Sequence, residues 1–229
     1  MDVSIIVPTY NEKDNIPILA ERLFEALKKA SIEGELVIVD DGSPDGTGDV
    51  AEKLGKKYPV TVVHRSGKLG LSSAVLEGFA MATGDYLGVM DADLSHPPEV
   101  IPQLVAAIKA GADLAPGTRY AQGGGVEHWP LHRQIISKVA TMLAQPLTPL
   151  SDPMSGLFMI KREVIEDVTL NPLGFKILLE IAVKGHVSKI TEVPFTFKDR
   201  LAGESKLNSK EQINYLKHLF ALYRYRYHI

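Results

Sequence analysis

The sequence predicts an α/β protein with a mainly parallel central sheet. Short runs rich in Val and Ile alternate with segments whose apolar residues recur at helical spacing, which is the pattern of repeated βαβ units. The chain has 229 residues, 45% of them hydrophobic, which is enough for one globular domain with a proper core. It has no cysteine, so disulfides and thiolate metal sites are excluded and a metal would need oxygen or imidazole ligands.

The first 120 residues contain the repeated units. The first strand is an apolar run broken at Pro8, and Asn15 with Pro17 marks the start of the helix that follows. The second strand ends in two acids before the turn sequence GSPDG. The third and fifth strands are short β-branched or apolar runs whose ends contain Arg65 and Arg119. The expected strands are 3–10, 35–43, 60–65, 85–93 and 112–120, and the expected helices between them are 11–30, 45–58, 70–83 and 96–111.

The pattern changes after Tyr120. Three glycines at 123–125 indicate a mobile loop, and a helix is expected over 135–147. Two interpretations of this helix remain open: a core helix, or a helix that lies in a membrane interface, helped by Trp129 and the basic residues Arg133 and Lys138. Its apolar face consists of Ile135, Ile136, Val139, Met142 and Leu143.

Charge is distributed unevenly. The net charge of −3 gives no sign of a nucleic-acid binder, but residues 200–229 carry six Lys or Arg against two Glu, so that segment is +4 and the remainder −7. The basic segment indicates either an anionic partner or a solvated surface helix. The sequence shows no signal peptide and no run of 18 apolar residues, so we expect a cytoplasmic location. This expectation does not exclude contact with a membrane surface.

Acidic and turn-forming residues follow nearly every predicted strand. In a parallel sheet, ligands bind beyond the carboxyl ends of the strands, so this clustering predicts a binding site there. Asp91 and Asp93 share one face of a strand end, where their mutual repulsion requires a cation. Mg²⁺ or Mn²⁺ held by two carboxylates and a diphosphate fits this D-x-D arrangement.

Two further segments have more than one interpretation. Asp40 and Asp41 in VDDGSPDGT could accept hydrogen bonds from a base or ribose, or could form an Asx turn or helix cap. In PTYNE, Asn11 and Glu12 could simply start a helix, while Tyr10 could stack on a flat ring. His96 is expected to be structural.

The motifs PTYNE, VDDGSPDGT, DADLSHPPE, GTRY, DPMSGLF and VPFTFKDRLAGESKL together resemble the family-2 glycosyltransferases, and within them the dolichyl-phosphate mannosyltransferases. The resemblance runs from Val3 to about Leu219 and implies one catalytic domain with a GT-A fold. It implies a nucleotide-sugar-binding half (1–120), an acceptor-binding half (121–207) and a C-terminal basic amphipathic helix (208–229).

The resemblance also implies roles for individual residues. Donor contacts would come from Pro8, Tyr10, Glu12, Val39, Asp41, Asp91, Ala92 and Asp93. The metal ligands would be Asp91, Asp93 and Ser95, although a serine hydroxyl is a weak ligand. Positive charge for the phosphate groups would come from Arg119, Lys176, Arg200 and Lys206, and Asp93, Arg119 and Arg200 would be catalytic.

The implied reaction is an inverting, metal-dependent transfer of mannose from GDP-mannose to dolichyl or another polyprenyl phosphate. A phosphate acceptor is already ionised at neutral pH, so no general base is needed. Alternatives are a polyprenyl-phosphate glucosyltransferase that uses UDP-glucose, a non-catalytic nucleotide-binding scaffold, and a soluble transferase to sugar hydroxyls with Asp152 as base.

The lipid acceptor implies contact with the cytoplasmic face of a membrane, the endoplasmic reticulum in a eukaryote or the plasma membrane in a prokaryote. Contact could come through a small anchoring subunit, through transmembrane helices of a longer protein, or through this chain's own surface helices. Tyr223, Tyr225 and Tyr227 with Arg224 and Arg226 would suit a belt at headgroup level.

Overall fold

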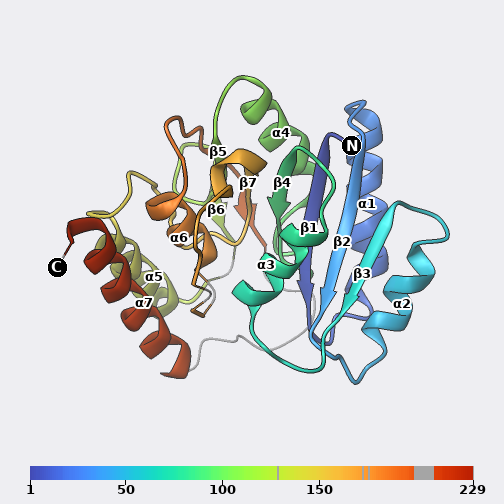
Figure 1. Ribbon diagram of the computed structural model, residues 1–229, viewed down its shortest axis with the longest axis horizontal. Coiled ribbons are helices and arrows are strands. Elements are labelled where there is room, and N and C mark those ends of the chain that lie inside the picture. Colours follow the sequence, from blue (N-terminus) through green and yellow to red (C-terminus); the bar gives the residue numbers. More distant parts are fainter. Residues whose placement is uncertain (128, 172, 175, 199–208, 229) are drawn as a thin grey trace.

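The computed structural model describes residues 1–127, 129–171, 173–174, 176–198 and 209–228. Its centre is a seven-stranded sheet with the order β3-β2-β1-β4-β7-β5-β8 (Figure 1). The strands are β1 (Val3–Thr9), β2 (Gly34–Asp40), β3 (Val60–His64), β4 (Tyr86–Val89), β5 (Leu114–Thr118), β7 (Phe158–Lys161) and β8 (Val193–Pro194). The five strands predicted from the sequence are all present.

The sheet is mainly parallel, as predicted. β1 pairs in parallel with β2 and β4, and β2 with β3, while β7 runs antiparallel between β4 and β5. The chain adds strands on one side of β1 and then crosses to β4 on its other side, which makes β1 and β4 a topological switch point. Ligands bind at such a point because the loops after the two strands diverge there.

Helices cover both faces of the sheet. They are α1 (Asn15–Lys29), α2 (Thr47–Leu54), α3 (Leu71–Met81), α4 (Ile101–Lys109), α5 (Leu131–Ala144), α6 (Ile177–Lys184) and α7 (Ser209–Tyr227), with 3₁₀ turns at Pro98–Val100 and Arg162–Ile165. A small parallel pair, β6 (Gly125–Val126) with β9 (Thr196–Phe197), lies apart from the main sheet. β6 falls within the glycine-containing loop of the sequence.

Side-chain alternation along β1 divides the core into two layers. Ile5 and Val7 face a cluster that includes α1 and α4, whereas Ile6 faces a cluster that includes α3 and α6. Both clusters are fully buried on the central strands, as expected for a sheet covered on two sides.

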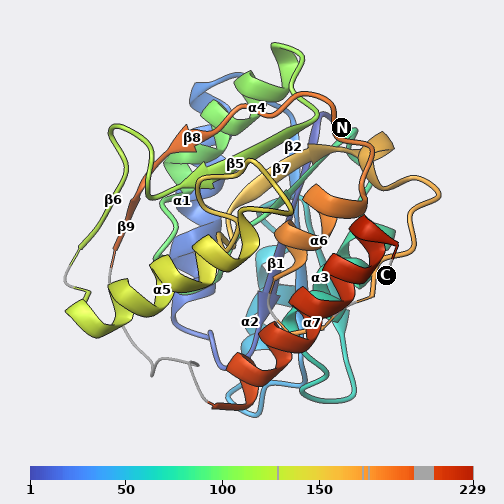
Figure 2. The ribbon, with the colours of Figure 1, turned by 90° about the vertical axis from the view of Figure 1, so that its left-hand side faces the viewer.

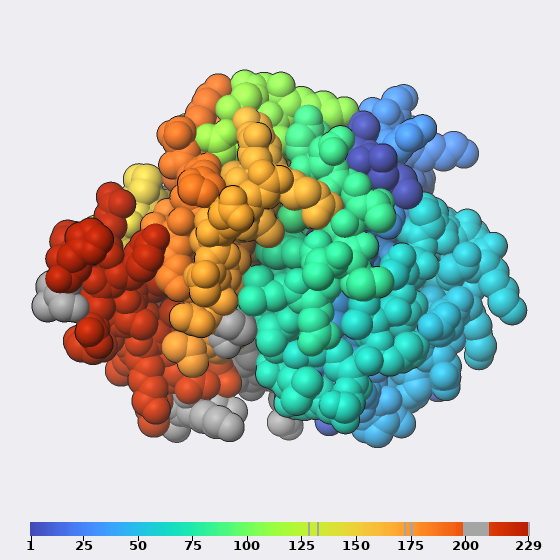
Figure 3. Space-filling model, viewed as in Figure 1, coloured from blue at the N-terminus to red at the C-terminus, as the bar shows by residue number. Residues whose placement is uncertain are grey.

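A third, smaller cluster joins α5, α6 and α7. α7 is held along α5 by tyrosine hydroxyls, because Tyr215 Oη donates to Ala140 O (2.6 Å) and Tyr223 Oη to Leu143 O (2.9 Å). Figure 2 shows the two helices on the same side of the molecule, and Figure 3 shows α7 forming one flank of it.

The predicted apolar face of α5 is exposed, so its interpretation as a core helix is wrong. The exposed fraction on this face ranges from 44% for Ile136 to 62% for Met142, and Ile213, Leu216 and Phe220 of α7 are also exposed. The helix turns this face outward because it contacts α7 through the opposite side. Within the described ranges, no helix is both long and apolar enough to cross a bilayer.

Gly78 allows α3 to pack close against β1 of the sheet. A Cβ at Gly78 would lie 2.4 Å from Ile6 Cγ2, so we expect Gly78→Ala to lower the free energy of unfolding by about 1–2 kcal/mol despite alanine's better helix propensity. Urea denaturation would measure the change. Gly125→Ala, where nothing lies within 4 Å of the added Cβ, is the matched control and should be nearly neutral. An unchanged Gly78→Ala midpoint would contradict this packing.

Candidate active site

The loops that follow β1 to β5 meet at one edge of the sheet. Parallel register places Thr9 beside Asp40 and Asp40 beside His64, so the residues after these strands are neighbours in space. Figure 1 shows the carboxyl ends of β1, β2 and β3 at the lower edge of the sheet. The predicted clustering of acidic and turn residues at this edge is confirmed.

The D-x-D loop begins directly after β4. Asp93 is buried, whereas the side chain of Asp91 is 32% exposed. Ser95 donates to Asp93 Oδ1 through both its backbone N (3.1 Å) and its hydroxyl (2.5 Å), and Leu94 between them has a φ of 61°. A left-handed leucine is strained, and such strain is found where a loop must aim functional groups. Ser95 therefore orients Asp93; its predicted contact with a metal stays a prediction.

The buried side chain of His96 packs under the D-x-D loop and hydrogen-bonds to its backbone. It is buried, it packs edge-on against Phe195 and Phe197, and its Nδ1 accepts a hydrogen bond from Asp91 N at 3.1 Å. Burial lowers the pKa of His96 more than the nearby Asp91 and Asp93 raise it, so its neutral form is favoured. These contacts agree with the structural role expected for it.

Gly156 of the DPMSGLF motif closes the other side of the D-x-D loop. A Cβ there would lie 3.3 and 3.4 Å from the two carboxylate oxygens of Asp91 and 3.1 Å from His96 Cε1. A side chain at this position would press on the carboxylate, which explains why the loop needs a glycine there.

Arg119 and Asp152 form a buried, two-pronged ion pair. Arg119 Nε donates to Asp152 Oδ2 at 2.6 Å and Nη2 to Oδ1 at 2.7 Å, and Arg119 N also donates to Oδ2. The side chains are 8% and 0% exposed. Burial lowers the pKa of Arg119, but the hydrogen bonds and charge of Asp152 outweigh it, so the net pKa is raised and the guanidinium stays charged.

An aromatic cluster lies over the Arg119 side chain. Arg119 Cζ is 5.0 Å from the ring centroid of Trp129, and Arg133 Cζ, in the first turn of α5, is 4.0 Å from the same centroid. The sequence suggested headgroup contact for Arg133 and a membrane role for Trp129. The structure instead brings both beside Arg119, and no pattern in the sequence could indicate that stacking.

Lys176 lies at the start of α6. Its Nζ donates to Met154 O at 3.3 Å. Burial, and then the positive charge of Arg119, lower the pKa of Lys176 to about 8, although Asp152 and Asp91 oppose the shift. Lys176 and Arg119 therefore form a positive region that faces the Asp91 carboxylate.

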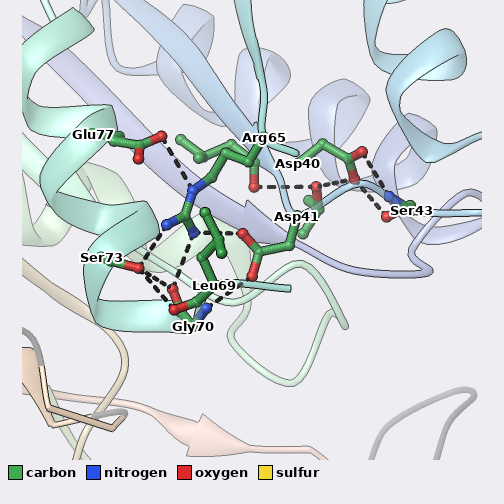
Figure 4. Close-up of polar contacts among 10 residues, drawn as sticks. Asp40, Asp41, Ser43, Arg65, Leu69, Gly70, Ser73 and Glu77 are labelled. Carbon is green, nitrogen blue, oxygen red and sulfur yellow. Dashed lines mark hydrogen bonds and ion pairs between the residues drawn. The ribbon is translucent and has the colours of Figure 1, made fainter. Parts of the chain in front are cut away.

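Asp40 and Asp41 follow β2, which lies on the opposite side of β1 from β4 and the D-x-D loop. Figure 4 shows their polar contacts. Asp40 makes the turn, because Ser43 N and Oγ both donate to it, at 3.0 and 2.5 Å. Asp41 instead accepts from Arg65 Nη1 (2.5 Å) and Gly70 N (3.2 Å). The Asx-turn interpretation thus applies to Asp40, whereas Asp41 is held by Arg65 and Gly70 and its contact with the donor stays a prediction.

The remaining predicted donor residues have mixed exposure. Pro8, Tyr10 and Glu12 are half-buried, and Lys68 Nζ lies 4.3 Å from the Tyr10 ring centroid, whereas Val39 and Ala92 are buried. Arg200 and Lys206 lie outside the described residues. Lys198, which is described, lies beside the D-x-D loop, since Lys198 N donates to Ser95 O at 3.2 Å.

A switch-point edge with a D-x-D loop and nearby cations is typical of nucleotide-sugar transferases with the GT-A fold. The chain matches the family model "Glycosyl transferase family 2" over residues 4–169. It is 52% identical over 98% of its length to a dolichol-phosphate mannosyltransferase of Pyrococcus furiosus, of which it spans 64%, and 44% identical over 99% to that of Saccharomyces cerevisiae, of which it spans 89%. The chain therefore belongs to glycosyltransferase family 2, in the group that contains the dolichol-phosphate mannosyltransferases.

Solved structures agree on the fold. Mannosyl-3-phosphoglycerate synthase from Rubrobacter xylanophilus has a TM-score of 0.73 at 17% identity, covering 100% of this chain and 76% of that one. Glucosyl-3-phosphoglycerate synthase from Mycobacterium tuberculosis has a TM-score of 0.69 at 20% identity, with 98% and 80% covered. At these identities the likeness shows the GT-A fold alone.

The lowered pKa of Lys176 predicts that anion binding at this site depends on pH. If its ammonium binds phosphate, affinity for GDP should fall as pH rises from 7 to 9, because the free protein loses this charge near pH 8. Isothermal titration calorimetry at several pH values would measure it. Lys176→Arg keeps its charge throughout and should flatten the profile, while Lys176→Met should bind weakly at every pH. A wild-type profile that matches Lys176→Arg would contradict the role.

Proposed function

We propose that this protein transfers mannose from GDP-mannose to dolichyl or another polyprenyl phosphate with inversion, giving a β-linked mannosyl phosphate. The observation that carries the proposal is the ion pair in which Arg119 donates hydrogen bonds to both carboxylate oxygens of Asp152. A transferase to sugar hydroxyls would need a carboxylate base near the DPMSG motif, and both oxygens of Asp152 accept hydrogen bonds from a guanidinium. A phosphate acceptor needs no such base because it is already an anion at neutral pH.

Charge supports a phosphate acceptor. Arg119 keeps N–H groups that Asp152 does not use, and Arg133 and Lys176 lie in the same region. Trp129 Nε1 is buried and has no hydrogen-bond partner among the described residues, so a phosphate oxygen would satisfy it. These donors would hold the acceptor oxygen against C1 of the sugar as the bond from C1 to the β-phosphate oxygen of the nucleotide breaks.

The D-x-D carboxylates fit a hard divalent cation. No group of three or more acidic or histidine side chains that could hold a metal occurs in the described part of the chain. Asp91 and Asp93 together with donor phosphate oxygens make the ligand set that Mg²⁺ or Mn²⁺ prefers. When bound, the cation neutralises charge on the leaving diphosphate. A structural relative, glucosyl-3-phosphoglycerate synthase from Mycobacterium tuberculosis, has been solved with Mn²⁺ and UDP-glucose.

The identity of sugar and lipid rests on the relatives. Those that the chain matches along nearly its whole length are named dolichol-phosphate mannosyltransferase. Transfer of glucose from UDP-glucose to the same acceptor is the second candidate. A donor screen with radiolabelled GDP-mannose and UDP-glucose, each with and without dolichyl phosphate, tests the proposal. Lipid-soluble label from GDP-mannose is the expected result; label from UDP-glucose alone, or none, would reject it.

The metal proposal predicts a large effect at the D-x-D loop. Asp91→Asn or Asp93→Asn each removes a full charge, so turnover should fall at least ~100-fold. Excess EDTA should do the same to the wild-type protein, and Mg²⁺ or Mn²⁺ should restore it. The exposed Asp49→Asn in α2 is a control for loss of one negative charge and should keep full activity. Undiminished turnover in EDTA would overturn metal dependence.

We also propose that the exposed faces of α5 and α7 lie on a cytoplasmic membrane surface. Both present large apolar side chains outward, and Arg133 in the first turn of α5 lies next to the proposed acceptor region. A polyprenyl chain leaves a bilayer at a cost of ~0.8 kcal/mol per CH₂, so the phosphate should be met at the surface. Attachment through a small anchoring subunit would use the same faces.

Ile136 and Val139 test this orientation. Because both side chains are exposed, changing the pair to Asp should leave the melting temperature and GDP affinity nearly intact. Activity on long-chain dolichyl phosphate in vesicles should fall at least several-fold, while a short water-soluble prenyl phosphate should be used almost as before.

The matched control for this pair is Ile18→Asp on α1, which is also 44% exposed but lies away from α5. It should affect neither acceptor. A collapsed melting temperature for the Ile136 and Val139 variant, or equal loss with both acceptors, would contradict the membrane orientation.

A further inference from the structure

Arg65 is a buried cation outside the predicted site. It follows β3, and its side chain is 3% exposed. None of the donor, acceptor or metal roles inferred from the sequence involves it. A buried guanidinium is retained at low cost only where its donors are satisfied, so its partners indicate its purpose.

The partners of Arg65 come from three separate segments (Figure 4). Nη1 donates to Asp41 Oδ1 at 2.5 Å and to Gly70 O at 3.2 Å, and Nη2 donates to Ser73 Oγ at 2.7 Å. Nε forms an ion pair with Glu77 Oε2 at 3.1 Å but makes no hydrogen bond of acceptable geometry. The guanidinium thereby joins the end of β2, the loop 66–70 and the first two turns of α3.

Asp41 is fixed from two sides by this arrangement. Arg65 Nη1 donates to one carboxylate oxygen of Asp41, and Gly70 N donates to the other at 3.2 Å. Arg65 Nη1 also donates to the carbonyl oxygen of Gly70. The same loop carries Lys68, whose ammonium lies over the Tyr10 ring. Gly70 has a φ of 108°, a value that a side chain would strain, so the loop geometry is set by its anchors.

We propose that Arg65 is a positioning residue for the nucleotide donor: it holds Asp41 and the loop 66–70 in the arrangement that receives the base end of the nucleotide. This inference rests on the proposed function. It assigns Arg65 no contact with the reacting atoms. Lysine would keep the charge but lose the planar fork that reaches Asp41, Gly70 and Ser73 together.

The test is nucleotide binding, which needs no transfer. By calorimetry, Arg65→Lys should weaken GDP binding at least ~10-fold. Kinetically, donor KM should rise while acceptor KM and kcat at saturating donor change little. If Arg65 acts through Asp41, the double variant Arg65→Lys with Asp41→Asn should bind GDP no more weakly than Asp41→Asn alone.

Arg162→Lys is the matched control. Arg162 also uses a forked guanidinium, on the carbonyls of Ala82 and Gly84 before β4, at the far end of the sheet. It should lower the melting temperature without changing GDP affinity. Ser73→Ala, which removes only the partner of Nη2, is the milder variant if Arg65→Lys does not fold, and it should weaken GDP binding in a folded protein.

Equal GDP affinity in the wild type and in a folded Arg65→Lys or Ser73→Ala would overturn the inference and leave the proposed function standing. An additive double variant would also overturn it. If the wild type binds and uses UDP-glucose instead, the proposed function fails, and weaker UDP binding by Arg65→Lys would still support the positioning role.

Discussion

Repulsion among carboxylates at one edge of the sheet is the constraint around which the site is arranged. Parallel strands bring Asp40, Asp41, Asp91 and Asp93 to one edge, and the segment before the antiparallel β7 adds Asp152. A cluster of like charges is stable only if each is compensated. The compensation is specific: Asp40 accepts from Ser43, Asp41 from Arg65 and Gly70, Asp93 from Ser95, and Asp152 from Arg119. Asp91 keeps a third of its side chain exposed, which suits it to a bound cation.

The Arg119–Asp152 pair links this edge to the acceptor side. Removing one partner of a buried ion pair leaves the other charge uncompensated and typically costs about 3–5 kcal/mol, so the pair fixes the fold as well as the charge of the site. The Trp129 ring contacts both Arg119 and Arg133, and Arg133 lies in the first turn of α5. A displacement of α5 would therefore move Arg133 and Trp129 relative to Arg119, and so disturb the Arg119–Asp152 ion pair.

The attachment of α7 to α5 explains why so much apolar surface remains outside. Tyrosine hydroxyls bond to carbonyls at the end of α5, and the third core cluster beneath the helices is small. Helices joined in this way do not need to bury their apolar stripes against each other. The stripes stay available for another apolar phase, which fits the proposed lipid acceptor.

Local pattern in the sequence was sufficient for the α/β class, the first five strands, the edge at which the site forms, and the D-x-D loop. These features depend on the period of apolar residues and on turn chemistry, both of which act over a few residues. The glycosyltransferase family also followed from short motifs. By contrast, β7 was not predicted, because an antiparallel strand inserted between β4 and β5 is a matter of long-range pairing.

Only the tertiary structure showed which carboxylates are engaged by other protein groups and which keep part of their surface exposed. Nothing in the local sequence distinguishes Asp40 from Asp41 or reveals that Asp152 meets Arg119, since the partners are 24 and 33 residues away. The sequence likewise could not settle whether the stripe of α5 faces the core or the outside, because a helix carries the same apolar period in both cases. Its orientation depends on α7, which packs against it from 75 residues further along the chain.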